Sequence, residues 1–453
     1  MTAAHPFDPS VAIRRLDLAA VLAGDSDAIR QRDALVRRGA VPDPAMRDAV
    51  RATLSAVRSD GDAAVRETND RVGGGYADGR LVLTAAELHV ARDGLAPKVR
   101  TALEQAVDHV RRFAETQRPQ SRRTTIVPGI EIERRWTALD SVGCYVPGGS
   151  APYPSSLVMT VVPAQVAGVA RIVVASPADR DGAIHPVLLG VAGLLGVETF
   201  IVAGGAQAVG ALAYGLPRAG VAPVDRIVGP GNAWVTAAKL EVSGEVGIDM
   251  AAGPSEGMVL ADAGADPRLV AADLITQAEH GPDSPALLVT TDAGFAERVL
   301  RAVGVWLATA SRGAILERAL AEHGCVVLAP TLDAAIDFVN AYAPEHLSVD
   351  VEPLEPTVSR LRNAGSLFVG RWAPESAGDY ATGANHVLPT GGLARACGGL
   401  SVEAYGKYTQ VQRVTEAGLA SIRSSVATLA DTEGLLAHRD AIESRFTLRQ
   451  AER

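Results

Sequence analysis

The feature that most constrains the fold is a regular alternation of short apolar runs with helical segments between residues 145 and 369. Short continuous apolar strands separated by helices are typical of parallel sheets whose two faces are both covered. The sequence therefore predicts an α/β fold. The expected strands are 125–127, 130–132, 141–145, 172–176, 199–203, 226–228, 246–250, 258–261, 286–290, 325–329, 347–349 and 366–369. The expected helices among them are 186–195, 207–214, 233–242, 267–280, 294–309 and 332–341.

The chain has 453 residues, whereas single hydrophobic cores stop growing near about 250–300 residues. Because the alternation comes in two tracts, we expect two Rossmann-like domains with parallel sheets, one inserted in the other. The first would comprise 45–144 and 256–400, and the second 145–255. Residues 1–44 are predicted to form an N-terminal extension. Residues 401–453 are predicted to form a helical arm that crosses to a partner subunit.

Composition excludes several classes of protein. A net charge of −9 with interspersed signs argues against binding to nucleic acid or to an anionic membrane. The apolar stretch 183–214 is interrupted by Pro186, Glu198 and several glycines, which favours buried elements over a membrane span. The three cysteines are far apart and odd in number, as expected of reduced thiols. With no signal-peptide pattern in the first 15 residues, the sequence predicts a cytoplasmic protein.

Three segments place histidine beside a carboxylate, although the chain has only nine histidines. They are 277–284, 343–347, and 375–380 with His386 behind it. Their clustering predicts an active site in the second half of the chain.

Gln277 and His280 fall in the last turn of the expected helix 267–280, which Asp266 caps. Because they are three residues apart, both project from one face. They are either ligands at the mouth of a sheet, where α/β proteins bind ligands, or a histidine that simply stabilises a helix C-terminus. Spacing alone favours the second interpretation, since glutamine is an uncommon zinc ligand.

Glu345 and His346 follow Pro344 at the start of an expected strand. Neighbours in a regular strand face opposite ways, so both reach one cleft only if the backbone is irregular there. They are either an acid–base pair or an exposed glutamate beside a half-buried histidine. Asp379, in a loop of small residues at 376–383, is either a ligand or part of an ordinary turn.

Two glycine-rich turns, 204–207 and 229–232, each open a helix and offer backbone N–H groups to an anion. Neither is a complete dinucleotide fingerprint. Near the C-terminus, Glu433 and His438 are five residues apart and do not share a helix face. Their pattern alone indicates a solvated helix start.

Taken together and in order, these segments resemble the histidinol dehydrogenase family. The resemblance runs from about residue 142 to residue 438, whereas the first hundred or so residues match only in general character. The matching motifs are Tyr145-Val146-Pro147-Gly148-Gly149, Gly204-Gly205-Ala206-Gln207-Ala208, Gly229-Pro230-Gly231-Asn232-Ala233, Ala252-Gly253-Pro254-Ser255-Glu256, Gln277-Ala278-Glu279-His280-Gly281-Pro282-Asp283-Ser284, Pro344-Glu345-His346-Leu347 and Ser376-Ala377-Gly378-Asp379-Tyr380.

The resemblance implies roles for individual residues, and it reverses the readings of Gln277 and His438 from pattern alone. It implies one Zn²⁺ per subunit of a homodimer, with His438 supplied by the other subunit, and it gives His386 no role. The implied zinc ligands are Gln277, His280, Asp379 and His438. The implied substrate contacts are Ser255, Gln277, His280, Glu345, His346, Asp379, Glu433 and His438. The implied NAD contacts are Tyr145, Gln207 and Asn232, and the implied catalytic pair is Glu345 and His346.

The implied reaction is a four-electron oxidation of L-histidinol to L-histidine through the aldehyde, with two NAD used in turn. His346 would accept the proton of the alcohol, Glu345 would activate water, and the zinc would orient the substrate. Residue chemistry alone also allows a zinc hydrolase with Glu345 as base, and a ligand-binding module without turnover. A family member that oxidises another amino alcohol is a further alternative. A neutral glutamine ligand also suggests that Mn²⁺ or Co²⁺ could replace zinc.

Overall fold

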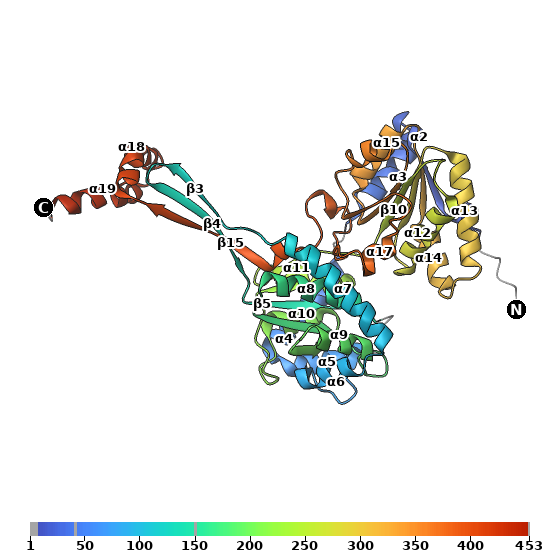
Figure 1. Cartoon of the computed structure of the whole chain (residues 1–453), viewed down its shortest axis with the longest axis horizontal. Coiled ribbons are helices and arrows are strands. Elements are labelled where there is room, and N and C mark those ends of the chain that lie inside the picture. The colour runs from blue at the N-terminus through green and yellow to red at the C-terminus, as the bar shows by residue number, and fades with distance from the viewer. Residues whose placement is uncertain (1–7, 40–42, 149–151, 452–453) are drawn as a thin grey trace. The chain divides into compact units, whose positions relative to one another are not determined.

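The computed structural model describes residues 8–39, 43–148 and 152–451. They fall into two compact units. The first comprises the chain up to Gln117 together with Leu139–Tyr405, and the second comprises Arg118–Ala138 with the chain from Gly406 onward (Figure 1). The first unit holds two six-stranded sheets, each largely or wholly parallel, so the expected α/β class is confirmed.

Sheet A has the order β1-β12-β11-β10-β13-β14, and every neighbouring pair is parallel. Both faces are buried: Val259 of β10 packs into one apolar cluster with α12, α13 and α14, whereas Met258 and Leu260 pack into another with α15. This alternation is what a strand covered on both sides requires. The strands are β1 (Arg14–Asp17), β10 (Gly257–Ala261), β11 (Ala286–Thr290), β12 (Cys325–Leu328), β13 (His346–Asp350) and β14 (Ser366–Val369). The helices are α1 (Pro9–Ala12), α2 (Leu18–Leu22), α3 (Ser26–Val36), α12 (Pro267–Glu279), α13 (Ala293–Leu307), α14 (Gly313–His323), α15 (Leu332–Tyr342), α16 (Leu354–Val358) and α17 (Glu375–Tyr380).

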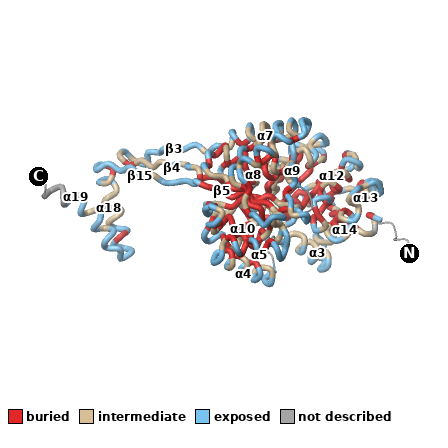
Figure 2. Tube along the Cα trace, turned by 90° about the horizontal axis from the view of Figure 1, so that it is seen from below, coloured by how far each residue is buried: buried red, intermediate tan, exposed pale blue. Residues whose placement is uncertain are grey.

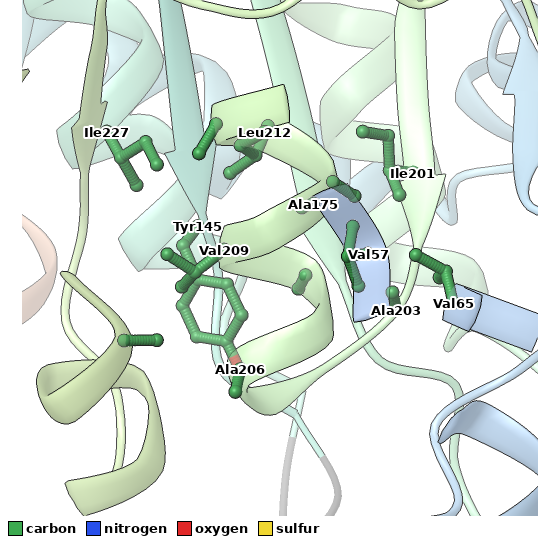
Figure 3. Packing of buried hydrophobic residues seen from close by; sticks show 14 of the residues in the cluster. Val57, Val65, Tyr145, Ala175, Ile201, Ala203, Ala206, Val209, Leu212 and Ile227 are labelled. Atoms are coloured by element: carbon green, nitrogen blue, oxygen red, sulfur yellow. The ribbon is translucent and has the colours of Figure 1, made fainter. Parts of the chain in front are cut away.

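Sheet B has the order β2-β7-β6-β5-β8-β9, with β2 antiparallel and the rest parallel. Its core joins Tyr145, Ile201 and Ile227 of the sheet to Leu212 of α10 and Val57 of α4 (Figure 3). The strands are β2 (Val82–Thr84), β5 (Ser141–Tyr145), β6 (Arg171–Ser176), β7 (Thr199–Val202), β8 (Arg226–Val228) and β9 (Gly247–Ile248). The helices are α4 (Pro44–Asp60), α5 (Asp62–Val72), α6 (Ala85–Asp93), α7 (Pro97–Thr116), α8 (Pro154–Ala167), α9 (Pro186–Leu194), α10 (Gly205–Tyr214) and α11 (Ala233–Val242), and short 3₁₀ turns lie at Leu393–Arg395 and Val402–Tyr405.

The expected grouping of segments differs from the one observed. Residues 45–144 were expected to join 256–400, but β5 pairs with β6 and β8 in sheet B, and α4 packs against α10. The expected N-terminal extension, 1–44, supplies β1 to sheet A, where it pairs with β12. An apolar run shows that a strand forms but not which sheet it joins, because pairing depends on contacts distant in sequence.

The second unit is an antiparallel sheet followed by two helices. Its order is β15-β4-β3, from β3 (Arg122–Val127), β4 (Ile130–Ala138) and β15 (Gly406–Val414), and α18 (Glu416–Thr432) and α19 (Leu436–Ala451) follow. The arm was expected to be helical from 401, so its strand β15 is a correction, whereas the strands expected at 125–127 and 130–132 are confirmed as β3 and β4. Figure 2 shows few buried residues along these elements, and Leu429, Leu435 and Leu436 are exposed.

Helix α8 was not expected from the sequence. Eleven of its fourteen residues are buried, so it lacks the apolar stripe by which an amphipathic helix is recognised. The loop expected at 145–152 lies partly outside the described residues, because 149–151 are not among them. Among the described residues, no helix is long and apolar enough to cross a bilayer.

Candidate active site

The candidate catalytic residues meet where two neighbouring strands of sheet A begin. His346 is the first residue of β13 and pairs with Gly257, the first residue of β10. Its backbone N–H donates to the carbonyl of Glu256 at 3.2 Å, which brings Ser255 and Glu345 side by side. Both line a cavity of about 580 Å³ together with His280, His346 and Asp379. The end of α12 that carries Gln277 and His280 leads into β11 and so lies at the amino edge of sheet A, whereas open α/β sheets usually bind ligands at the carboxyl edge.

An irregular backbone brings Glu345 and His346 to the same cavity. Ala343 has φ +54°, an uncommon conformation for a residue with a side chain, and Pro344 follows it. Glu345 therefore precedes the strand rather than alternating within it. An irregular backbone at this point was the condition expected from the sequence for both side chains to reach one cleft.

Glu345 is buried, and two donors hold its carboxylate. Oε2 accepts from the Ser255 hydroxyl at 2.8 Å and from the Glu256 backbone N–H at 2.9 Å. Burial raises the pKa of Glu345 well above its usual range, although these two hydrogen bonds oppose the shift. A carboxylate with a raised pKa is a stronger base once ionised.

His346 is a neutral imidazole with one free nitrogen. Burial lowers the pKa of His346 to about 3. Nδ1 lies 3.2 Å from Oε1 of Gln277, while the Gln277 amide nitrogen donates to Ser255 at 3.4 Å. This network assigns the proton to Nδ1, because an amide oxygen can only accept. Nε2 is then a buried acceptor without a hydrogen-bond partner among the described residues.

A cluster of two carboxylates and an imidazole lies beside this pair. His280 Nε2 is 3.3 Å from Oε1 of Glu375 and 3.8 Å from Oδ2 of Asp379, and one ligand atom from each of the three lies within 4.8 Å of the others. Burial lowers the pKa of His280, but the two carboxylates outweigh it and raise the pKa to about 9. Such a donor set suits a divalent cation. Gln277 is buried next to the cluster, with its amide oxygen directed to His346.

Glu375 and Asp379 come from α17, a helix where a loop of small residues was expected. Four residues apart, they share one face of that helix. Sequence reasoning included Glu375 in a histidine–carboxylate segment but gave it no role, because the spacing is informative only if the segment is helical.

His386 also lines the cavity, and its ring is fixed by hydrogen bonds. Nδ1 lies 2.9 Å from the Asp379 carbonyl and Nε2 lies 3.3 Å from the Ser156 hydroxyl. It thus supports the backbone of a metal-ligand candidate. Glu433 and His438 belong to the second unit, at the end of α18 and in α19, where both are exposed.

The expected NAD contacts line a second cavity, of about 1100 Å³. Tyr145 ends β5, Gln207 is in the first turn of α10 after β7, and Asn232 caps α11 after β8, accepting from the N–H groups of Trp234 and Val235. This cavity therefore lies at the carboxyl edge of sheet B, the usual ligand edge of parallel sheets. Asn69 and the glycines of 73–75 also line it, and the sequence did not single them out.

Glycine is required where this second cavity adjoins the first. Gly229 has φ +115°, and a Cβ there would lie 2.1 Å from the Tyr145 carbonyl oxygen. The Gly205 N–H donates to the Tyr145 hydroxyl at 3.3 Å. Tyr145, Gly148 and Asn232 line both cavities, so the two spaces adjoin.

The fold, the buried pair of titratable side chains and the adjoining larger cavity are those of an α/β enzyme, and the family to which the chain belongs is one of oxidoreductases. The family model described as histidinol dehydrogenase matches residues 36–446, and the chain belongs to that family. The chain is 46% identical over 397 residues to the histidinol dehydrogenase of Leifsonia xyli, covering 87% of this chain and 91% of that protein. It is 42% identical over 401 residues to that of Methanosarcina barkeri, covering 88% and 91%. A crystal structure of histidinol dehydrogenase from Elizabethkingia anophelis matches with a TM-score of 0.88 at 32% identity, covering 97% of this chain and 99% of that one.

Proposed function

We propose that this chain oxidises L-histidinol to L-histidine through the aldehyde, with two NAD consumed in turn and one Zn²⁺ bound per subunit. The observation that carries the proposal is the pair at the start of β13. His346 is neutral, and its Nε2 has no hydrogen-bond partner in the part of the chain that the structure describes; beside it lies the buried carboxyl group of Glu345. The substrate is inferred from membership of the histidinol dehydrogenase family.

His346 is the proton acceptor for the alcohol. As the carbon–hydrogen bond releases a hydride, the hydroxyl proton passes to Nε2, while Nδ1 stays bound to Gln277. Glu345 then removes a proton from the water that adds to the aldehyde, giving the hydrate that the second oxidation converts to the carboxylate. Ser255 holds the Glu345 carboxylate in place for this step.

NAD, when bound, would supply the hydride acceptor for each oxidation. Tyr145, Gln207 and Asn232 would bind it at the carboxyl edge of sheet B, where free N–H groups and glycines let a ligand approach closely. Tyr145 and Asn232 also line the smaller cavity, so a dinucleotide held by them would lie next to the substrate.

Zinc would anchor and orient the substrate's imidazole and amino nitrogens, a template role. Gln277, His280 and Asp379 would hold it with the partner subunit's His438, and the partner's Glu433 would contact the substrate. The cluster around His280 supports this set, and the exposed leucines of the second unit suit a dimer interface. Substrate and cofactor, together with three cysteines that form no disulfide, suit a cytoplasmic enzyme.

The test is to mix the purified protein with L-histidinol and NAD and to follow NADH to completion, with and without a chelator. Two NADH per histidinol, lost on chelation and restored by zinc, is the expected result. One NADH per histidinol would contradict the role of Glu345. No NADH would favour the hydrolase or the binding module, and faster turnover of another amino alcohol would mean a changed substrate.

A further inference from the structure

Arg38 lies just after α3, in a part of the chain that the sequence treats as a peripheral extension. Its side chain is only 16% exposed. Nε donates to Oε2 of Glu256 at 2.6 Å, Nη2 binds the other oxygen of that carboxylate, and the guanidinium lies 3.2 Å from the centre of the Tyr342 ring. Glu256 is itself buried, so this is a bidentate ion pair inside the protein.

The remaining N–H groups of Arg38 bind backbone carbonyls. Nη1 donates to Leu35 at 3.2 Å and to Tyr342 at 2.7 Å, and Nη2 donates to Ala343 at 3.4 Å. All five donors of the guanidinium are therefore used. An ion pair that only neutralised Glu256 would need two of them. Of the other three, two bind the end of α15 and the turn after it, and the third binds the last turn of α3.

Both segments that hold the catalytic carboxylate are attached to Arg38. On one side, Ala343, with its positive φ, leads through Pro344 into Glu345. On the other side, Glu256 supplies the backbone N–H that binds Glu345, and its neighbour Ser255 supplies the hydroxyl. The Glu256 carbonyl also receives the N–H of His346. A shift in either segment would therefore move the Glu345 carboxylate relative to its donors and to His346.

We infer that Arg38 is a positioning residue for Glu345 and His346, joining the turn at Ala343 to the start of β10 so that the acid–base pair keeps its geometry. The inference rests on the proposed function, in which these two residues perform the proton transfers. Arg38 itself does not line the substrate cavity. It acts only by holding Glu345 and His346 in position.

The decisive variant is the double substitution Arg38→Met with Glu256→Met. Removing Arg38 alone would leave a buried, unpaired carboxylate, which is strongly destabilising, whereas the double variant removes the whole pair. We expect kcat for both oxidations to fall about 10- to 100-fold, since small misplacements of catalytic groups cost that much. The KM for histidinol and the zinc content should change less than about threefold, because no proposed metal ligand is touched.

Two further variants serve as controls. Arg38→Lys keeps the charge but offers three donors in place of five, so it cannot bind both oxygens of Glu256 and the three carbonyls at once. We expect it to show the same loss of kcat in a folded enzyme. Arg47→Met removes the hydrogen bonds of another arginine to a glutamate, Glu241 on α11. Neither residue lines either of the two cavities, and Glu241 keeps its bonds to Arg51. This substitution should leave kcat unchanged.

A second measurement does not depend on turnover. Hydrogen exchange of the peptide containing 343–347 should be faster in the Arg38 variants than in the native protein and unchanged in Arg47→Met. A double variant with native kcat, or with native exchange in this peptide, overturns the inference. Absence of NADH formation by the native enzyme would instead overturn the proposed function, and the exchange result would still decide whether Arg38 fixes the turn.

Discussion

The two sheets of the first unit build their cavities from opposite edges. In sheet B the cavity lies at the carboxyl ends of β5, β7 and β8, where glycine turns expose backbone to a ligand. In sheet A the cavity lies at the amino ends of β10 and β13 and is lined by titratable side chains. The carboxyl edge of sheet B, where parallel sheets usually bind ligands, needs only tight turns to form its cavity. The cavity at the amino edge of sheet A depends on the end of α12, on α17 and on the irregular turn at Ala343. Under the proposed function, NAD binding and proton transfer would take place at two different kinds of sheet edge.

The largest effect is expected at the amino edge of sheet A, from His346→Gln. It removes the free ring nitrogen, and kcat for the first oxidation should fall about 10³-fold, within the range for general base catalysis. Rapid-mixing measurement of NADH formation checks this. A loss of less than about tenfold, with zinc still bound, would assign the first proton transfer to another group.

Next comes Glu345→Gln, which keeps an oxygen acceptor for Ser255 and Glu256 but removes the base. The first NADH should form at a near-native rate and the second about 10²-fold more slowly. The progress curve should show a burst of one NADH per histidinol. Equal slowing of both phases would mean that the two residues of the pair act as one unit.

A smaller effect is expected from Glu375→Gln, which tests whether this carboxylate belongs with the metal cluster. The affinity for zinc should fall about 10- to 100-fold, the usual cost of losing a partner of the ligand set. Metal content after dialysis against a graded chelator measures it. Glu279→Gln is the matched control, because Glu279 lines the same cavity but lies outside the cluster.

The smallest effect is expected at the carboxyl edge of sheet B, from Asn232→Ala. Loss of the cap on α11 should lower the free energy of unfolding by about 1 kcal/mol and raise the KM for NAD more than it lowers kcat. Asp292→Ala removes a comparable cap from α13, away from both cavities. It should lower the free energy of unfolding by a similar amount and leave the KM for NAD unchanged. If Asp292→Ala raised the KM for NAD as much as Asn232→Ala does, the effect of Asn232→Ala would come from lost stability and not from NAD binding at the carboxyl edge of sheet B.

The fold class was predictable wherever a short apolar run alone defines an element. β6, β7, β8 and the strands of sheet A from β10 onward lie where the sequence places them, within a residue or two. The division into domains was not predictable, because strand pairing joins distant segments such as Arg14 and Cys325. Helix α8 was missed because it is buried on nearly all sides.

The site was predictable only in part. Histidine–carboxylate clustering pointed to Glu345, His346 and Asp379, whereas the interpretation of Gln277 came from the family resemblance. The edge of the sheet was not predictable, because the sequence does not show which strand the end of α12 adjoins. Arg38 carried no signal at all, because its role depends on carbonyl groups that the fold brings to it.

The order in which sheet A is assembled has a consequence for synthesis of the protein. β1 leaves the ribosome long before its partner β12, which begins at Cys325, whereas the parallel strands of sheet B lie between Ser141 and Ile248. Sheet B can therefore fold on the nascent chain while β1 stays unpaired and open to wrong partners until β12 has been made. Sheet A is completed late, and a chain that lacks residues 14–38 would lose both an edge strand of this sheet and Arg38.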